Sequence, residues 1–356
     1  MKYGIMTFHE VWNYGAVLQN FALQKVVEQI ISKEDTIETI DLPKSYFAGK
    51  TQLFNFEKHD FLRSLAQNIY LYPYKKNKQK AFNGFKKNEM NFSRRIFQVE
   101  DILKYDGFIV GSDQVWNPEI TGFDESFFLN FSEKNSKKIA YAASIGKDIL
   151  TEKERMFLKN NISNFNNISV REKSAKDILS EMGYTDVVKV LDPTLLLQKK
   201  EWEKLDNNKF QGKKFILVYT LEKNDLINFV VRYLQEKFKL EVIYLTPNNK
   251  KDFFGSKNSF GPYDFISAFK NAQYVITNSF HGTAFAINFE KNFITIPHKT
   301  RGTRMKSLLE DLNLNSRIYE NSFEDVPCEK INYTDVMTRL NFFREESLDF
   351  LKKSLL

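Results

Sequence analysis

The sequence predicts an α/β protein built from two Rossmann-like domains. Short apolar runs alternate with segments of helical periodicity in two parts of the chain, and a polar stretch separates these parts. The length of 356 residues also suits two domains better than one. We expect the first domain over residues 1–195 and the second over 196–332. A terminal helix at 333–355 is expected to join the first domain.

The first half opens with a β-α-β unit. Residues 2–8 and 36–42 are typical of strands, and residues 16–31 carry apolar side chains at helical spacing. This order predicts a right-handed crossover between parallel strands. The connecting loop at 12–15 is either a ligand loop or a plain glycine-containing turn. Further strands are expected at 107–110, 138–143, 168–170 and 187–191, with a helix at 173–182.

Polar or small residues follow these strands, where ligands bind in an open parallel sheet. Gly111 and Ser112 are small enough to let the backbone approach a ligand, and Asp113 and Gln114 can hydrogen-bond sugar hydroxyls. The repetition of such residues after successive strands favours a binding site along this edge of the sheet.

Residues 45–100 interrupt the alternation and are expected to form a helical insertion, with helices at 61–70 and 81–90. Basic side chains alternate there with aromatic ones. Such a segment either rests on an anionic membrane surface or forms a solvated face, and we favour the solvated face. The basic residues are Lys75, Lys76, Lys78, Lys80, Lys86, Lys87, Arg94 and Arg95.

The second half repeats the alternation after a connector at 196–212, which is expected to be polar with little core. In this half a strand at 274–276, a sharp turn and a helix carry His281, and a second strand follows at 293–296. The strand ends before Asn278 and Ser279, which are turn and cap residue types, and the helix continues from Gly282. A helix start offers free N–H donors to an anion, and an imidazole there can take or give a proton. The alternative is a histidine that only packs the turn.

Composition limits the partners. The net charge of +7 and the pI of about 9.0 favour anionic partners. No apolar stretch is long enough to span a membrane, and the single Cys328 excludes an internal disulfide and fits a reducing cytoplasm. The histidines show no metal-ligand spacing. We therefore predict a cytoplasmic protein with no metal and no nucleic-acid partner, and with peripheral contact at the inner face of the membrane as a further expectation.

Six motifs appear in the order typical of one family. They are Asn13-Tyr-Gly15, Gly111-Ser-Asp-Gln-Val-Trp116, Ala143-Ser-Ile-Gly146, Ser169-Val-Arg-Glu172, Leu191-Asp-Pro-Thr194 and Thr277-Asn-Ser-Phe-His-Gly282. With them the chain resembles the polysaccharide pyruvyl transferases over most of its length. Residues 45–100 and the carboxyl-terminal region match loosely. The resemblance implies two facing domains of the GT-B type with the site in the cleft between them.

The resemblance also implies the activity. The family transfers a pyruvyl group from phosphoenolpyruvate to a sugar, commonly as a cyclic ketal, in capsular or surface polysaccharide synthesis. No metal or redox cofactor is obligatory, and the acceptor is a sugar or a lipid-linked oligosaccharide. His281 matches the family histidine, the expected general acid/base, and Arg171 suits a carboxylate or phosphate. Expected binding residues are Asn13, Gly111, Ser112, Asp113, Gln114, Trp116, Ser144, Asn278, Ser279, Gly282, Arg301 and Arg304, whereas Asp192 is expected to hold the Pro193 turn or the domain junction.

One departure concerns the donor. Family members commonly have Arg-Leu directly before the histidine, where this chain has Ser279 and Phe280. The missing charge would then come from Arg171, Arg301 or Arg304. Two alternatives stay open: a GT-B glycosyltransferase that uses a nucleotide sugar, and a non-catalytic glycan-binding assembly protein.

Overall fold

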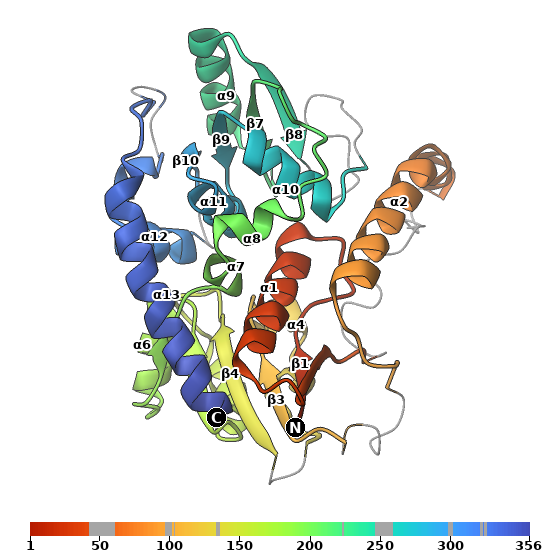
Figure 1. Ribbon diagram of the computed structural model, residues 1–356, viewed down its shortest axis with the longest axis vertical. Helices are drawn as coiled ribbons and strands as arrows, with labels where there is room; N and C mark the ends of the chain where they lie inside the picture. The colour runs from red at the N-terminus through yellow and green to blue at the C-terminus, as the bar shows by residue number, and fades with distance from the viewer. Residues whose placement is uncertain are drawn as a thin grey trace.

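Two parallel β-sheets organise the chain in the computed structural model (Figure 1). The structure describes residues 1–42, 61–96, 102, 104–132, 136–222, 224–245, 259–297, 302–320, 323 and 326–356. The larger sheet has six strands in the order β2-β1-β3-β4-β5-β6, and the smaller has four in the order β10-β9-β7-β8. Neighbouring strands are parallel in both sheets, in agreement with the predicted fold class.

The strand order of each sheet contains one switch point. The larger sheet consists of β1 (Lys2–Met6), β2 (Thr36–Thr39), β3 (Gly107–Val110), β4 (Lys137–Ala143), β5 (Asn167–Val170) and β6 (Val188–Lys189). The smaller consists of β7 (Phe215–Tyr219), β8 (Glu241–Leu245), β9 (Tyr274–Thr277) and β10 (Asn292–Thr295). The order changes direction between β1 and β3 and between β7 and β9. Ligands bind at the carboxyl ends of strands at such points.

Helix α2 differs from the prediction. It is one helix, Phe61–Glu89, with Pro73 inside it, where the sequence suggested two. Lys, Gln and Ala are good helix formers, so the polar segment after the proline continues the helix. Figure 1 shows α2 projecting away from the sheets. Residues 45–60 and 97–100 of the predicted insertion lie outside the described part of the chain.

The expectation of a polar connector at residues 196–212 is wrong. Helix α7 (Pro193–Leu196) ends where this stretch begins, and α8 (Lys199–Glu203) lies within it. Trp202 is fully buried, and its ring lies 5.7 Å from that of Phe21 and 4.8 Å from that of Phe285. Because these two partners belong to different halves of the chain, the segment packs into the core between them.

A continuous hydrophobic core joins the two halves. The ring of Tyr14 stacks on Phe265 with centroids 4.8 Å apart, and its hydroxyl donates to the Phe260 carbonyl at 2.8 Å. Helix α13 (Tyr333–Leu355) also contacts both halves, since Arg344 donates to the Leu195 carbonyl at 2.6 Å and to Asn288 at 2.9 Å. The domain division at residue 195 stays a prediction.

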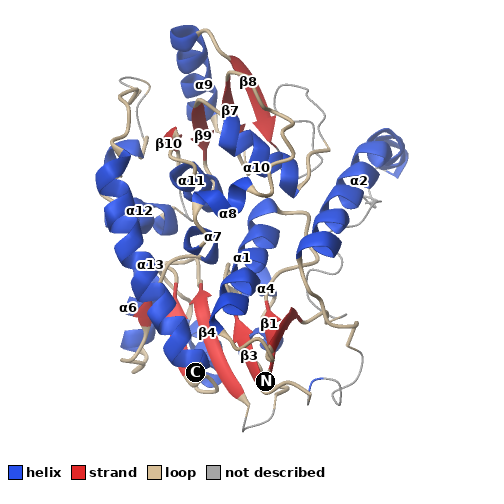
Figure 2. Cartoon of the chain, in the orientation of Figure 1, coloured by secondary structure: helices blue, strands red, loops and turns tan. Residues whose placement is uncertain are grey.

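The other helices pack around the sheets (Figure 2). They are α1 (Tyr14–Ile30), α4 (Pro118–Thr121), α5 (Glu152–Ile162), α6 (Lys173–Glu181), α9 (Asp225–Phe238), α10 (Pro262–Asn271), α11 (Phe280–Asn288) and α12 (Thr303–Asp311), with 3-10 turns at Glu125–Phe128 and Asn315–Arg317. Among the described helices, none combines the length and apolarity that crossing a membrane requires.

Candidate active site

His281 lies at the junction of the two halves. It is the second residue of α11, directly beyond the end of β9, and only 7% of its surface is exposed. The sequence placed it at such a helix start. Its ring packs on the backbone of Gly15 in α1, because a Cβ at Gly15 would lie 2.1 Å from Nδ1. Residues at the switch points of both sheets therefore meet around this imidazole.

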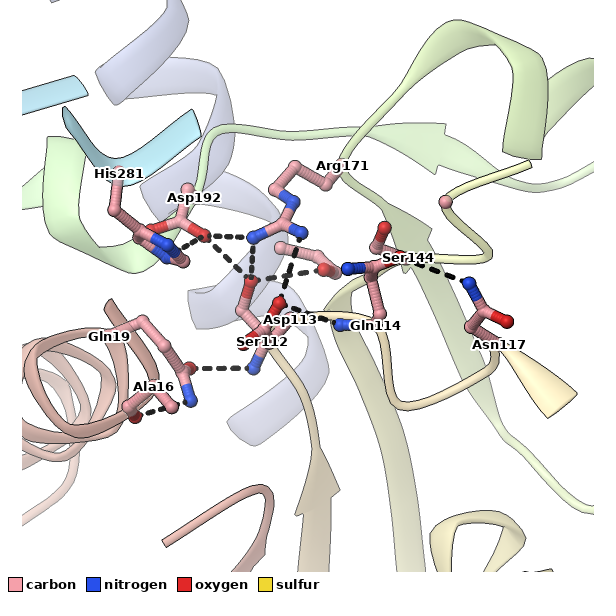
Figure 3. Close-up of polar contacts among 12 residues, drawn as sticks. Ala16, Gln19, Ser112, Asp113, Gln114, Asn117, Ser144, Arg171, Asp192 and His281 are labelled. Atoms are coloured by element: carbon pink, nitrogen blue, oxygen red, sulfur yellow. Dashed lines mark hydrogen bonds and ion pairs between the residues drawn. The ribbon is translucent and has the colours of Figure 1, made fainter. Parts of the chain in front are cut away.

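Asp192 joins the predicted catalytic residues (Figure 3). Its Oδ2 lies 2.7 Å from Nη1 of Arg171 and 3.7 Å from Nε2 of His281. The same oxygen accepts a hydrogen bond from the Ser112 hydroxyl at 2.9 Å. The other oxygen, Oδ1, accepts from the amide and hydroxyl of Thr194 at 3.0 and 2.7 Å. Asp192 thus holds its own turn, as expected, and also brings Arg171 and His281 together.

The charges of this cluster stabilise one another. Burial alone would raise the pKa of Asp192, but the adjacent His281 and Arg171 outweigh it and hold that pKa well below its usual range. Arg171 is buried as well, which by itself lowers its pKa. The negative charges of Asp192 and Asp113 outweigh this effect, so the pKa of Arg171 is raised above its usual value. Both groups are therefore charged near neutral pH.

Arg171 already faces several carboxylates. Besides Asp192, Asp113 lies 3.5 Å from Nη2 and Glu172 lies 4.0 Å from Nε. The ring of Phe280 covers the guanidinium at 4.5 Å. With its charge offset in this way, Arg171 is better placed to position Asp192 than to bind a substrate anion by itself.

Three buried polar atoms of the site have no hydrogen-bond partner among the described residues. They are Nε2 of His281, Nε of Arg171 and Oε2 of Glu172. Buried polar groups are nearly always paired, and exceptions tend to occur where a ligand or water completes the set. Nε2 of His281 lies 3.7 Å from the Asp192 carboxylate, and Nε of Arg171 lies 4.0 Å from Oε2 of Glu172. We therefore take this cluster as the strongest candidate active site in the described structure.

Ser144 and Glu172 shape the loop beside the cluster. Oε1 of Glu172 accepts from the Ser144 hydroxyl at 2.9 Å and from the amides of Ile145 and Gly146, both at 3.0 Å. The Ser144 side chain is fully buried. Its contact fixes the loop after β4, and its predicted contact with an acceptor stays a prediction.

Gly111 and Gln114 support the loop after β3. Gly111 has φ of 128°, and a Cβ there would lie 1.9 Å from the Tyr141 carbonyl oxygen, so only glycine fits. The carboxamide of Gln114 packs on Gly146 and accepts from Asn117 at 3.0 Å. Both residues place Ser112 and Asp113 next to Arg171.

The Trp116 side chain is buried, whereas the sequence suggested that it contacts the acceptor. Its indole is 1% exposed, stacks on Phe128 with centroids 5.8 Å apart, and donates to the Phe127 carbonyl at 3.3 Å. An indole with its N–H satisfied inside an apolar cluster is a packing residue. A tryptophan in a loop motif does not by itself distinguish burial from ligand contact.

Asn13, Asn278 and Gly282 have structural contacts. The Asn13 side chain accepts from the Ala16 amide at 3.2 Å and caps α1. Asn278 accepts from the Leu221 amide at 2.7 Å and so holds the loop after β7. A Cβ at Gly282 would lie 2.1 Å from the Thr277 hydroxyl, so this glycine allows α11 to pack closely on β9.

The remaining predicted residues surround α11. Ser279 is its N-cap residue, although its side chain makes no capping bond. Arg304 lies in the first turn of α12, which packs against α11. Arg301 lies outside the described part of the chain. The described contacts therefore do not show which residue replaces the arginine that family members commonly carry before the histidine.

Sequence reasoning missed the site role of Asp192 and the support from Gln19. The Gln19 side chain accepts from the Ser112 amide at 3.0 Å and donates to the Thr7 hydroxyl at 2.8 Å. The motif at 191–194 was visible, but Asp-Pro is also a common turn sequence. Gln19 lies inside a helix pattern and carries no sequence signal of its own.

Comparisons with known proteins identify a family and a similar fold. The sequence matches the family of polysaccharide pyruvyl transferases over residues 13–300. The fold is similar to that of S. aureus MnaA in its co-structure with UDP, with a TM-score of 0.52 and 15% identity over 95% of this chain and 86% of that chain. It is also similar to UDP-GlcNAc 2-epimerase from Neisseria meningitidis bound to UDP-GlcNAc, with a TM-score of 0.47 and 10% identity over 98% of this chain and 94% of that chain. No curated protein matches the chain. The predicted pair of Rossmann-like domains in a GT-B-like arrangement is thus confirmed.

Proposed function

This chain belongs to the polysaccharide pyruvyl transferase family, and we propose that it transfers the pyruvyl group of phosphoenolpyruvate to sugar hydroxyls as a ketal. The observation that carries the proposal is the buried triad in which one oxygen of Asp192 lies 2.7 Å from Arg171 and 3.7 Å from His281. The setting we propose is bacterial capsular or surface polysaccharide synthesis in the cytoplasm. Peripheral contact with the membrane stays a prediction.

The reaction requires proton transfers that an imidazole can perform. The enol carbon of the donor gains a proton, which leaves an oxocarbenium-like centre, and a sugar hydroxyl adds to that centre and loses its proton. A second hydroxyl then replaces phosphate and closes the ketal ring, and its proton leaves with the phosphate. In this proposal His281 carries protons between these groups, and the Asp192 carboxylate orients the ring and stabilises the imidazolium that forms.

The donor is an anion and needs positive charge. Since Arg171 lies within 4.0 Å of three carboxylates, we assign it the positioning of Asp192 and a shared contact with the donor. We assign the remaining positive charge to Arg301 and Arg304, which follow the strand after the histidine helix in the sequence. A guanidinium suits both a carboxylate and a phosphate because it donates two parallel hydrogen bonds.

A nucleotide-sugar glycosyltransferase is the second candidate. The S. aureus MnaA structure, which contains UDP, has a similar fold, so the fold alone does not separate the two functions. Thermal denaturation with each ligand separates them, because a ligand that binds the folded state raises the melting temperature. We expect phosphoenolpyruvate to stabilise the protein and UDP-GlcNAc not to; stabilisation by UDP-GlcNAc alone would favour the alternative.

A further inference from the structure

A cleft of about 640 Å³ lies between the loop after β1 and the carboxyl-terminal half of α2. We call it the α2 cleft and define it by Trp12, Asp41, Asn83, Lys86, Lys87 and Arg95, which all line it. Two of its lining residues, Trp12 and Asp41, come after β1 and β2 in the chain. The cleft therefore lies at the carboxyl edge of the larger sheet, where ligands of parallel sheets bind.

The loop after β1 connects the α2 cleft to the candidate active site. Trp12 precedes Gly15, which contacts His281, by three residues. On the other side, the His9 ring lies 3.1 Å from the Thr7 carbonyl, and the Thr7 hydroxyl donates to the Ser112 carbonyl at 3.0 Å. Segments that line this cleft therefore continue within a few residues into the segments that contact the candidate active site.

A metal site is the first interpretation to consider. His9, Glu10 and Asp41 bring one possible ligand atom each to within 4.8 Å of one another. However, Asp41 already lies 3.3 Å from His9, and Glu10 lies 3.4 Å from Arg95. The pKa of Asp41 is lowered, first by the hydrogen bond to His9, with further contributions from Arg95 and Lys86. These side chains neutralise the carboxylates, so the cluster needs no metal ion.

Two lysines that line the cleft, Lys86 and Lys87, can bind an anion. Within the described residues, neither Lys86 nor Lys87 has an ion pair or hydrogen bond to a carboxylate. Burial lowers the pKa of Lys86 to about 8, although the charges of Glu10 and Asp41 raise it. An ammonium group that has lost hydration without gaining a direct partner is stabilised by an anionic ligand.

The other walls suit a sugar. The half-buried Trp12 offers an aromatic ring, and Gln79 and Asn83 offer amide groups that both donate and accept hydrogen bonds. Aromatic surface with a few convergent polar groups is typical of a small-molecule site. We propose that the α2 cleft binds the acceptor as an anionic saccharide, with its charged group at Lys86 and Lys87 and its sugar against Trp12. The identity of this ligand as the acceptor rests on the proposed function.

Calorimetric titration of the full chain tests the binding step, with glucose 1-phosphate, glucuronate and glucose as probes. We expect at least one anionic sugar to bind about 10-fold or more tightly than glucose, and the K86A/K87A double variant to remove this difference. The matched control is K76A/K80A, which removes two exposed lysines of the same helix outside the cleft. Equal affinity for all three probes, or equal effects of the two double variants, would overturn the proposal.

The two anionic probes separate the sources of charge, because preference for glucose 1-phosphate indicates a phosphoryl group and preference for glucuronate a carboxylate. Steady-state kinetics then separates this proposal from the function on which it rests. If anionic sugars bind as expected but phosphoenolpyruvate gives no product, the transferase proposal fails and the cleft assignment stands. If transfer occurs and K86A/K87A leaves the acceptor KM unchanged, the cleft assignment fails alone.

Discussion

Gly15 and His281 come from different halves of the chain, yet the histidine ring lies directly on the glycine backbone. A Cβ placed on Gly15 would be 2.1 Å from Nδ1 and 2.7 Å from Cε1 of the ring. Glycine is therefore required at this position to leave room for the imidazole. The contact makes the position of the proposed proton carrier depend on the first turn of α1, across the junction of the two sheets.

Replacing Gly15 with alanine should displace the imidazole without unfolding the chain. A shift of about 1 Å in a catalytic group lowers the rate by about 100-fold, so we expect a loss of transfer of that order. The measurement is kcat for Gly15→Ala beside its melting temperature. Gly84→Ala is the matched control, because Gly84 also lies in a helix and has nothing within 4 Å of an added Cβ. Full activity in Gly15→Ala would show that the ring position does not matter.

Replacing Asp192 with asparagine should lower stability strongly. The change keeps the shape of the side chain but leaves Arg171, which is 6% exposed, without its closest counter-charge. Breaking a buried ion pair from one side costs about 3–5 kcal/mol, and we expect the low end because Asp113 is still nearby. Urea denaturation at pH 7 measures the change. A loss below about 1 kcal/mol would mean that the pair is effectively exposed to solvent.

The same pair predicts a pH dependence. The pKa of Asp192 in the folded protein is held well below the value of about 3.9 expected for an unfolded chain. Its contribution to stability is therefore complete above about pH 4 and is lost as the pH falls below that value, because the unfolded chain then takes up the proton first. The stability difference between the wild type and Asp192→Asn should therefore shrink as the pH falls below about 4. A difference that stays constant or grows would contradict this assignment.

Glu172 is predicted to be structural. Its Oε1 accepts from one hydroxyl and two backbone amides of the loop after β4, so Glu172→Ala leaves buried donors unpaired. We expect a cost of about 3 kcal/mol in the free energy of unfolding. Glu181→Ala is the control, since Glu181 ends the helix that Glu172 precedes, its side chain is 64% exposed, and within the described part of the chain it pairs only with Arg155 at the surface. Such surface pairs contribute at most about 1 kcal/mol. Equal losses for both variants would remove the structural role.

Much of this fold was predictable because its signals are local. The alternation of apolar runs and helical periodicity predicted both parallel sheets, and the turn residues before His281 predicted its place at a helix start. Six short motifs in order predicted the family. These features depend on neighbouring residues in the chain, which is the information that periodicity and spacing contain.

The contacts made across the fold were not predictable in the same way. Trp202 lies in a polar stretch, yet it is buried because Phe21 and Phe285, which are distant in sequence, pack around it. Asp192 was expected to hold a turn, and its contact with His281 depends on how the two sheets are placed. Trp116 has the same residue type as a sugar platform, and only its surroundings show that it belongs to the core.

Mass spectrometry of the acceptor tests the central claim most directly. A lipid-linked glycan is incubated with phosphoenolpyruvate and either the wild-type protein or His281→Ala, and both proteins are first shown to melt at similar temperatures. We expect the wild type to add one pyruvyl group per acceptor with release of phosphate, and the variant to add none. An acceptor pyruvylated equally by both proteins would mean that His281 does not carry the protons of the reaction.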